Sequence, residues 1–390
     1  MSSDASQSVA VIGVGHTKFS GGSTQGLREL ASEAGFNAMR DADTDPSDVD
    51  CLVVGVASGA MSEQYSPAAM VADSVGLRGV MLQRCEAACA TGSAALAAAV
   101  RTVKAGEART ALVIGAEVMS KRGTAESTYH LSRMTDCEFE YPLGITFPGM
   151  FGLMASSYMN RYSSTQEDLA LVSVKNHENA LENPYAQFHR RISVDDVLNS
   201  KMVADPLHLL DCSPVSDGAA AVVISCREVA EKKEKAPVWI RGIGSASLGN
   251  LLAERRDLTS IPSVRLAARR AFANSGLRPD DVDVAELHDC FTIAELIEYE
   301  ELGFAERGKG AHLLRNGDTS ISGRIPVNPS GGLKAKGHPL GATGLSMVVE
   351  IVKQLRGELP AKRRVNGAKV GLTQNMGLTG QYSFVYVLSR

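Results

Sequence analysis

The 390-residue sequence lacks the features that mark nucleic-acid-binding, membrane and secreted proteins. It has no long basic run and a formal net charge of −4, so we expect no nucleic-acid partner. No window holds the roughly 18 uninterrupted apolar residues of a membrane-spanning helix. The opening MSSDASQSVAVIG has no basic stretch followed by an apolar core, so no secretory signal is expected. The final VLSR is not a peroxisomal signal of the Ser-Lys-Leu type.

Disulfide, metal and dinucleotide motifs are missing as well. The seven cysteines, an odd number, are scattered without the spacing of a disulfide framework, and we expect a reducing, cytoplasmic location. Cys85 and Cys89 form a Cys-x-x-x-Cys pair, but no second pair has ligand spacing, so no metal site is expected. A dinucleotide site is excluded because GVGHTKFSGG (13–22) does not contain Gly-x-Gly-x-x-Gly.

The sequence does contain short apolar runs that alternate with alanine-rich helical segments. The runs predict buried strands at 9–15, 51–57, 110–117, 220–225, 238–244, 282–288 and 370–377. Such runs favour parallel or mixed sheets covered on both faces by helices. We therefore predict the α/β class, with either two domains or one large duplicated domain.

The two halves of the sequence resemble each other in three features that follow the same order. An apolar run with two glycines opens each half, PSDVDCLVVG (46–55) matches PDDVDVAELH (279–288), and an ATG triplet begins a long helix in both. Three matches in one order predict an internal duplication. We place the halves at 1–230 and 236–390, with an inserted region of about 121–205 in the first half. Such insertions on a rigid scaffold often hold substrate contacts.

The helices that begin at the ATG triplets, 90–92 and 342–344, are apolar on nearly every side. A surface helix would carry a polar face, so both helices are expected to be buried. Two buried helices between two sheets predict a layered molecule with helices inside as well as outside.

Cys89 stands at the start of the first buried helix, in RCEAACATGSAALAAAV (84–100). Unpaired backbone N–H groups and the helix dipole favour an anion there, so we expect a lowered thiol pKa and a candidate nucleophile. The alternative is a small buried residue in a closely packed helix.

Three further segments contain reactive groups. ELHDCF places His288 and Cys290 after a predicted strand, at the edge where α/β sheets bind ligands, although a hydrogen-bonded turn is the alternative. His338 lies among glycines in VNPSGGLKAKGHPLGATG (327–344), before the second buried helix, and is a candidate for proton transfer rather than a surface histidine. LTQNMGLTG (372–380) either presents backbone N–H groups as oxyanion donors or forms a plain hairpin.

Together these motifs resemble those of the thiolase superfamily. CATGSAAL, HDCF, NPSGGLKAKGHPLGATG and QNMGLTG occur in the order and at the intervals of the sterol-carrier-protein type of thiolase and its bacterial and archaeal relatives. The resemblance covers essentially the whole chain, including CSPVSDGAAAVV (212–223). It implies a five-layered α-β-α-β-α fold from two duplicated halves plus an inserted loop domain. It also implies a CoA-dependent acyltransferase that cleaves 3-oxoacyl-CoA or runs the reverse Claisen condensation.

The resemblance implies a role for each reactive residue. Cys89 would accept the acyl group, and His338 would take its proton or polarise the substrate carbonyl. Better-known thiolases have Asn-Glu-Ala-Phe in place of HDCF, and a C-terminal Cys-x-Gly where this chain has TQNMG without a cysteine. Cys290 would replace that missing acid and base, while His288 would help to bind the thioester oxygen.

Substrate contacts are expected from two other segments. Backbone N–H groups of Cys89 and of 374–377, which includes Asn375 and Gly377, would hold the oxyanion. Ser213 would line the tunnel by which the pantetheine arm of CoA reaches Cys89 from the inserted region. CoA is a substrate here, and no metal or redox cofactor is expected.

Other functions fit parts of the pattern. A ketoacyl-carrier-protein synthase or an HMG-CoA synthase would share the fold, but HDCF offers a thiol where those families need His, Asn or Glu. A non-catalytic subunit would not need four reactive groups, whereas a thiolase active only with a small zinc-ribbon and OB-fold acyl-CoA-associated protein stays open. By analogy we expect a homodimer or homotetramer. Acetoacetyl, branched, steroid and aromatic acyl groups, and both reaction directions, also stay open.

Overall fold

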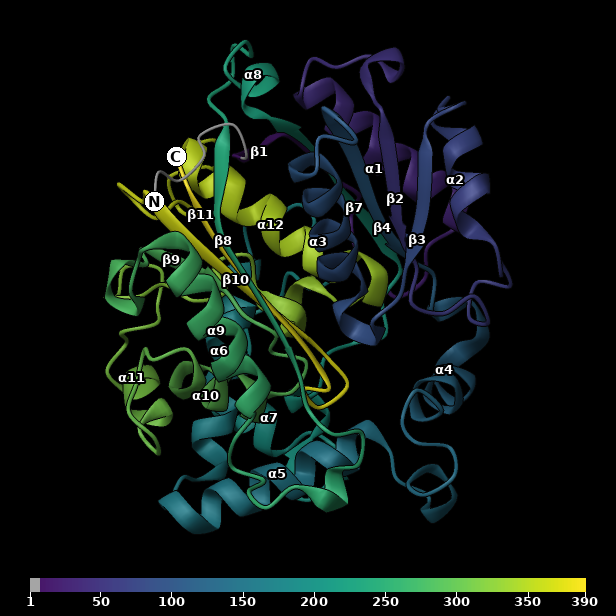
Figure 1. The fold of residues 1–390 in the computed structure, drawn as a ribbon. Helices are drawn as coiled ribbons and strands as arrows, with labels where there is room; N and C mark the ends of the chain where they lie inside the picture. Colours follow the sequence, from purple (N-terminus) through teal and green to yellow (C-terminus); the bar gives the residue numbers. More distant parts are fainter. Residues whose placement is uncertain (1–7) are drawn as a thin grey trace.

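The computed structural model describes residues 8–390, which fold into two α/β halves on either side of two buried helices (Figure 1). In the first half, five strands lie in the order β3-β2-β4-β7-β1. β2 is parallel to β3 and β4, whereas β7 is antiparallel to β4 and β1. These strands are β1 (Val9–His16), β2 (Cys51–Gly55), β3 (Met81–Cys85), β4 (Thr110–Glu117) and β7 (Gly218–Cys226).

The second half repeats this arrangement with four strands in the order β8-β11-β10-β9. They are β8 (Val238–Ser247), β9 (Val284–Glu286), β10 (Val370–Gly377) and β11 (Tyr382–Ser389). β9 is parallel to β10, and β11 is antiparallel to β10 and β8. The order and directions match those of β1-β7-β4-β2, so the predicted duplication is confirmed in the topology. The boundaries of the halves at 230 and 236 stay a prediction.

The strands form one continuous nine-stranded sheet, although we expected two separate sheets. The two halves are joined where β1 pairs with β8 through only two residue pairs, Ala10 with Trp239 and Val11 with Val238. β1 and β8 are equivalent edge strands of the two halves, so their unpaired backbone groups meet where the halves touch.

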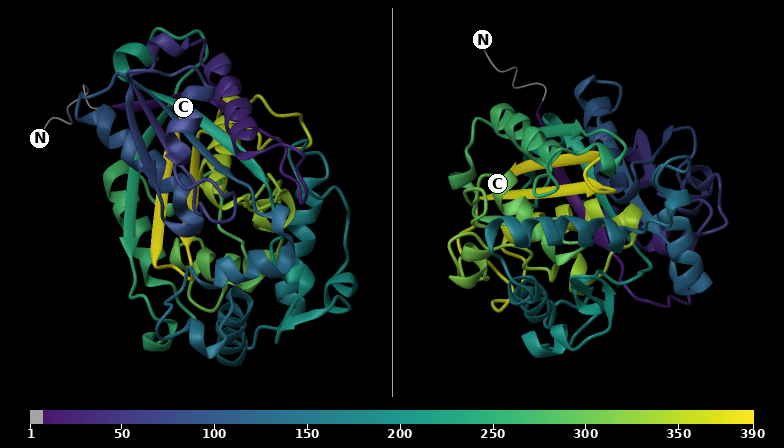
Figure 2. Two further views of the ribbon diagram at one scale, coloured as in Figure 1. Left: turned by 90° about the vertical axis from the view of Figure 1, so that its right-hand side faces the viewer. Right: turned by 90° about the horizontal axis from the view of Figure 1, so that it is seen from below.

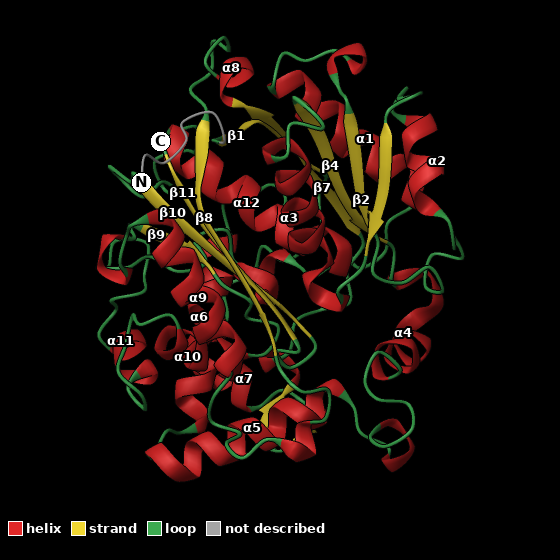
Figure 3. Ribbon diagram, in the orientation of Figure 1, coloured by secondary structure: helices red, strands yellow, loops and turns green. Residues whose placement is uncertain are grey.

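Helices lie on both outer faces and between the halves (Figure 3). α1 (Leu27–Asp41) packs on β1, β4 and β7, and α2 (Pro67–Ser74) packs on β2 and β3. α3 (Thr91–Lys104) packs on β2 and β4, whereas α12 (Leu340–Arg356) contacts β4 and β7 as well as β10. α9 (Pro262–Ser275) covers β8 and β11, and α10 (Thr292–Glu301) packs beside α9. The two halves of the sheet form the two β layers on either side of α3 and α12 (Figure 3), so the five-layered α-β-α-β-α arrangement is confirmed.

The glycines around the central helices allow an unusually close approach. Every residue of α12 from Leu340 to Val352 is buried. A Cβ atom on Gly92 would lie 2.7 Å from the carbonyl oxygen of Gly341, and a Cβ atom on Gly115 would overlap the same oxygen. α3, α12 and β4 can pack this closely only because these positions have no side chain.

The inserted region begins just after β4 and lies at one end of the strands (Figure 2). It contains α4 (Gly123–Ser132), α5 (Phe147–Tyr162), α6 (Gln166–Ala180) and α7 (Val194–Leu198), followed by the small β5–β6 hairpin (Met202–Ala204 and Leu207–His208). α5 and α6 pack against α10 of the second half. Two short helices, α8 (Arg227–Ala230) and α11 (Gly310–Arg315), complete the set.

Strands β5, β6 and β11 were not among the predicted strands, although β11 is a mostly buried apolar run, and neither was β3. It is an edge strand, and its MLQRC segment has exposed side chains and no continuous apolar run, so the periodicity of a buried strand is missing. Within residues 8–390, no helix combines the length and the apolar character that crossing a membrane requires.

Candidate active site

Cys89 lies in a single turn of 3-10 helix, Ala88–Ala90, that leads directly into α3. Two residues next to it, Ala88 and Leu378, have left-handed backbones with φ of 49° and 59°. Neither is glycine, so each position stores about 1–3 kcal/mol of strain. The backbone N–H groups of Leu378 and of Cys89 itself favour the thiolate and act to lower the pKa of the thiol. The strained backbone thus points two donors at the sulfur.

The expectation of a lowered thiol pKa at this helix start was wrong. Burial raises the pKa of Cys89 to about 12, and the nearby carboxyl group of Glu117 raises it further against the two backbone donors. Only 8% of Cys89 is exposed, so the thiolate would lose its water shell, and the helix start does not compensate for that loss. The resting thiol is therefore protonated and needs a base to react.

Two histidines flank Cys89. One ring nitrogen each of His288 and His338 and the sulfur of Cys89 all lie within 4.8 Å of one another. The two rings meet edge to face, with centroids 5.0 Å apart. Burial lowers the pKa of His338 to about 3 and lowers that of His288 well below its usual value, helped by His338. Both rings are therefore neutral at physiological pH.

Hydrogen bonds determine which nitrogen of His338 is free. Its Nδ1 lies 2.7 Å from the hydroxyl oxygen of Thr343, and that hydroxyl lies 2.9 Å from the carbonyl oxygen of Pro339. Because a carbonyl can only accept, Thr343 donates its hydrogen to Pro339 and must accept from Nδ1–H of His338. The buried Nε2 of His338, which has no partner among the described residues, then carries a lone pair. His338 is arranged as a base.

His288 is held by backbone and side-chain contacts from the second half. Its backbone N–H donates to Glu298 at 2.9 Å and to Gln374 at 3.2 Å. Its Nδ1 lies 2.8 Å from the amide nitrogen of Asn375, which also donates to the carbonyl oxygen of Cys89 at 3.3 Å. The amide nitrogen of Asn375 therefore links His288 to the backbone of Cys89 by hydrogen bonds.

A cavity of about 220 Å³ opens at Cys89. Cys290, His338 and Ser213 line it with Cys89, and none of its lining residues is Asp, Glu, Lys or Arg. Side chains from the inserted region form much of the wall, including Thr124, Thr128, Leu131, Phe147, Phe151, Val203 and Leu209. The space is suited to an uncharged, mainly apolar group.

Cys290 faces this cavity but is otherwise packed in the core, with 5% of its surface exposed. Its carbonyl accepts a hydrogen bond from the backbone N–H of Ser213 at 2.9 Å. Burial raises the pKa of Cys290 well above its usual value, and the adjacent Cys89 adds to this rise. The thiol therefore holds its proton and can deliver it to a reacting carbon.

The structure brings all seven predicted site residues into one region. Gly377 packs so closely on the carbonyl of Ala87 that a Cβ atom would overlap it. The predicted hairpin alternative also holds, since β10 and β11 pair throughout. The donor that reaches Cys89 from this hairpin is Leu378, one residue beyond the expected segment 374–377, because its left-handed backbone turns the N–H inward.

The sequence placed Asp289 in the reactive HDCF segment without giving it a role, and it did not identify Glu117. Asp289 accepts hydrogen bonds from the backbone N–H groups of Leu333 at 2.7 Å and Lys334 at 3.1 Å and from Asn176 at 2.7 Å. It thereby ties HDCF to the loop before His338 and to α6. Glu117 accepts from three backbone N–H groups, including that of Gly341 at 3.0 Å, and burial raises its pKa to about 7. The one signal for Glu117 was a carboxyl group inside an apolar run.

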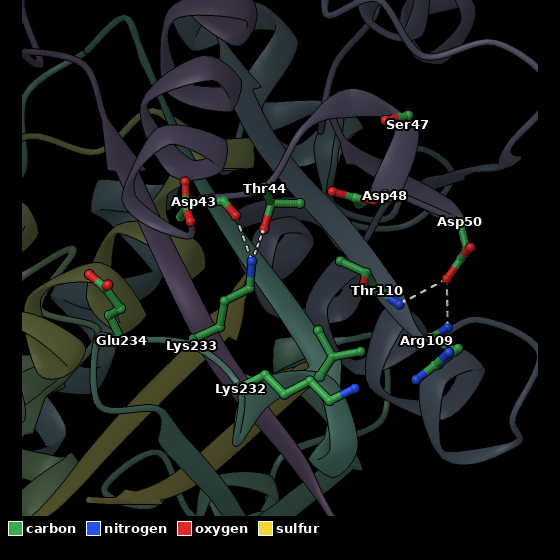
Figure 4. A pocket seen from close by; sticks show the side chains of 11 residues that line it. Asp43, Thr44, Ser47, Asp48, Asp50, Arg109, Thr110, Lys232, Lys233 and Glu234 are labelled. Atoms are coloured by element: carbon green, nitrogen blue, oxygen red, sulfur yellow. Dashed lines mark hydrogen bonds between the residues drawn. The ribbon is translucent and has the colours of Figure 1, made fainter.

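A second cavity, of about 470 Å³, lies at the opposite ends of the strands, where β2 and β4 begin (Figure 4). Lys233 donates to the backbone of Asp43 and to Thr44 at 3.1 Å, and Asp50 accepts from the backbone of Arg109 and Thr110. Lys233 and Asp50 thus hold neighbouring loops, and none of the residues that line this cavity is cysteine or histidine.

Comparisons with known proteins identify the family of the chain. Residues 9–228 match the family model "Thiolase, N-terminal domain", and residues 244–390 match "Thiolase C-terminal domain-like". The acetyl-CoA acetyltransferase of Methanothermobacter thermautotrophicus is 44% identical over 98% of this chain and 99% of its own length. Sterol carrier protein 2 of Bos taurus is 38% identical over 97% of this chain and 73% of its own length.

Among solved structures, the Ltp2-ChsH2(DUF35) aldolase superposes with a TM-score of 0.84 at 29% identity and covers 98% of both chains. The two family models together match nearly the whole sequence, and the fold agrees with them. The chain is an enzyme of the thiolase family.

Proposed function

We propose that the protein is a CoA-dependent thiolase that cleaves 3-oxoacyl-CoA with CoA, or runs the reverse condensation, through an acyl group on Cys89. One observation carries the proposal: a protonated thiol lies within 4.8 Å of two neutral imidazoles, beside an uncharged cavity with a second thiol. Covalent capture by a cysteine divides one difficult acyl transfer into two easier steps.

In the first step, His338 Nε2 removes the proton of Cys89 as the sulfur attacks the 3-keto carbon. A base is required because the pKa of the thiol is about 12, and general-base assistance contributes about 10²–10⁴ in rate. The backbone N–H groups of Cys89 and Leu378 would receive the oxyanion. Loss of one such donor costs about 10²–10³ in rate.

In the second step, the bond between C2 and C3 breaks and its electron pair forms the enolate of acetyl-CoA. His288 holds the enolate oxygen, and Cys290 gives its proton to C2. Acetyl-CoA leaves, while the acyl group remains on Cys89 as a thioester.

The third step returns every group to its starting state. Free CoA enters, its thiol proton passes to the Cys290 thiolate, and its sulfur attacks the acyl carbon. Cys89 leaves as the thiolate and recovers its proton from His338. No resident metal or redox cofactor takes part, and CoA acts as a substrate.

Acylation of Cys89 tests the proposal. The full chain is incubated with acetoacetyl-CoA in the absence of free CoA, and its intact mass and modified peptide are determined. We expect an acetyl adduct on Cys89 that added CoA removes and that Cys89→Ala abolishes. Cys212→Ala is the matched control, because Cys212 is a thiol of the same cavity with no assigned role. An adduct on another residue, or none, would contradict the proposal.

The same incubation tests Cys290. Cys290→Ala should slow adduct formation by about 10²-fold or more, because the enolate carbon then has no proton donor. Unchanged adduct formation would remove Cys290 from the mechanism.

A requirement for a partner protein is a separate question, because the similar aldolase is a complex of Ltp2 with ChsH2. We propose that the chain acylates Cys89 without a partner, because the nucleophile, base, proton donor and oxyanion donors all belong to this one chain. Acylation only after addition of a zinc-ribbon and OB-fold protein would contradict this.

Aldol cleavage is a second candidate, favoured by the similarity to that aldolase at 29% identity. Cleavage of a 3-hydroxyacyl-CoA would use His338 as the base for the hydroxyl proton and His288 for the enolate oxygen, without acylation of Cys89. Retained cleavage of a 3-hydroxyacyl-CoA by Cys89→Ala would favour it over the thiolase.

A further inference from the structure

The site contains a polar side chain that touches both Cys89 and His288 and that the mechanism above does not use. This side chain is Asn375, which is fully buried on β10. We propose that Asn375 is a positioning residue that places the single hydrogen of His288 on Nε2, and that it thereby also prevents Cys89, His288 and His338 from binding a metal ion. Only the use of this hydrogen in catalysis rests on the proposed function.

The orientation of the Asn375 amide follows from its neighbours. One end lies 3.3 Å from the carbonyl oxygen of Cys89, and the other lies 2.9 Å from the hydroxyl of Ser93. A backbone carbonyl can only accept, so the NH₂ group must face Cys89, and the amide oxygen accepts from Ser93. A Cβ atom on Gly344 would lie only 2.6 Å from this oxygen, which shows how closely the amide is packed.

This orientation determines the hydrogen position on His288. The same NH₂ group lies 2.8 Å from Nδ1, so Nδ1 must accept the hydrogen bond with its lone pair. The ring is neutral because burial disfavours the imidazolium, and its only ring hydrogen is therefore on Nε2. Nε2 is buried and has no partner among the described residues. An unpaired buried donor is costly unless a ligand oxygen satisfies it.

His288 and His338 therefore differ in their hydrogen positions although both are neutral. His338 presents a lone pair at Nε2 because Thr343 holds the hydrogen on Nδ1. His288 presents an N–H group at Nε2 because Asn375 occupies Nδ1. One ring can accept the thiol proton while the other donates to the substrate oxygen, with no proton transfer needed beforehand.

The same hydrogen matters for metal binding. A thiol and two imidazoles within 4.8 Å of one another are the ligand types and approximate spacing of a three-ligand zinc site. Asn375 occupies Nδ1 of His288, so only Nε2 is left to bind zinc. A histidine binds zinc with a lone pair, which this nitrogen does not have. Moving the hydrogen to Nδ1 would set two N–H groups against each other across the 2.8 Å contact with Asn375. Asn375 thus opposes capture of a metal by the nucleophile.

The hydrogen positions can be read directly by nitrogen NMR of the full chain labelled with [¹⁵N]histidine, assigned with His288→Gln and His338→Gln. In the unmodified protein we expect His288 to show a protonated Nε2 and a bare Nδ1, and His338 the reverse. A bare Nε2 on His288 would overturn the proposal. This measurement needs no catalytic activity, so a chain that shows the expected pattern but forms no acyl-Cys89 would contradict the proposed function alone.

Asn375→Asp tests the cause. A carboxylate can only accept, so Nδ1 of His288 must then carry a hydrogen, and at a pH above the pKa that the carboxylate raises the neutral ring exposes a lone pair at Nε2. We expect the His288 pattern to reverse and the affinity for Zn²⁺, titrated calorimetrically, to increase by about 10- to 100-fold. Asn375→Asp combined with Cys89→Ala should lose this gain, which separates the site from surface zinc. An unchanged His288 pattern, or no gain in a variant with the reversed pattern, would overturn the proposal.

Asn375→Ser keeps the position polar without a buried charge, so it tests the same cause if Asn375→Asp fails to fold. Serine is too short to span Cys89 and His288, so both hydrogen positions of His288 should become populated. A His288 that retains only the Nε2 hydrogen in this variant would show that Asn375 is not its cause.

Discussion

The rings of His288 and His338 lie edge to face at 84°, with centroids 5.0 Å apart and no carboxylate hydrogen-bonded to either ring in the described residues. A histidine paired with a carboxylate would be pushed toward the cationic form, whereas these two remain neutral. The site therefore combines neutral imidazoles with protonated thiols, rather than the thiolate and imidazolium of a preformed ion pair. Several tests depend on this difference.

The first prediction concerns the protonation of Cys89. Because its pKa is raised to about 12, the thiolate fraction should increase about tenfold for each pH unit between pH 7 and 10. The rate of iodoacetamide labelling, followed by peptide mass spectrometry, should rise in the same way. In the same digest the exposed Cys137 reports loss of reagent, and the buried Cys51 reports loss of the fold. A labelling rate that levels off below pH 8 would indicate a thiolate–imidazolium pair instead.

The second prediction concerns Thr343, whose hydroxyl holds the hydrogen of His338 on Nδ1. Thr343→Val keeps the volume but removes that acceptor, so the base loses its fixed hydrogen position. The rate of Cys89 acylation should fall by about 10–100-fold, while Thr343→Ser should retain most of it. Equal rates for the valine and serine variants would show that the hydroxyl does not orient the base.

The third prediction concerns Asp289, which accepts from the backbone of Leu333 and Lys334. These N–H groups donate to different oxygens of Asp289, so an asparagine there would turn its NH₂ group toward one of them and loosen the loop that carries His338. Asp289→Asn should reduce kcat for acylation by about 10-fold or more and affect KM less. Asp283→Asn is the matched control, because Asp283 also accepts from two backbone N–H groups, those of Lys369 and Val370, on another loop. Equal losses in both variants would point to general destabilisation.

The fourth prediction concerns the contact between β4 and α12. Gly115→Ala would drive a methyl group into the carbonyl of Gly341, and overpacking of this kind costs about 1–3 kcal/mol in the free energy of unfolding. The midpoint of urea unfolding should fall accordingly. Gly22→Ala, where a Cβ atom would meet nothing within 4 Å, should leave it unchanged. Equal midpoints for the two variants would show that the helix can move away freely.

The fifth prediction concerns the edge strand β3. Its backbone has one unpaired side, and Met81 and Leu82 are 39% and 43% exposed. Such an edge favours pairing with another strand, so we expect a homo-oligomer in which β3 of two copies meet. Light scattering after gel filtration should show a dimer or tetramer, and Leu82→Lys should shift it toward monomer. A wild-type monomer would contradict this expectation.

Sequence patterns predicted the layered fold, and the motifs named seven candidate site residues that the structure places in one region. Apolar runs mark buried strands because strand burial depends on local composition, and the helices after 90–92 and 342–344 are recognisable because they lack a polar face. Motif order then grouped Cys89, His288, Cys290 and His338. β3 was missed because exposed edge strands carry no such pattern.

Only the tertiary structure decided the chemical state of these residues. The helix-start argument for Cys89 is local, whereas the burial that reverses its pKa shift comes from the packing of both halves around it. Asn375 reaches Cys89 across 286 positions of the chain, and Asp217, 97 positions from Ser120, holds the segment that follows β4. A sequence pattern identifies which group is present. Its protonation and hydrogen position depend on desolvation and on partners that the fold brings from far along the chain.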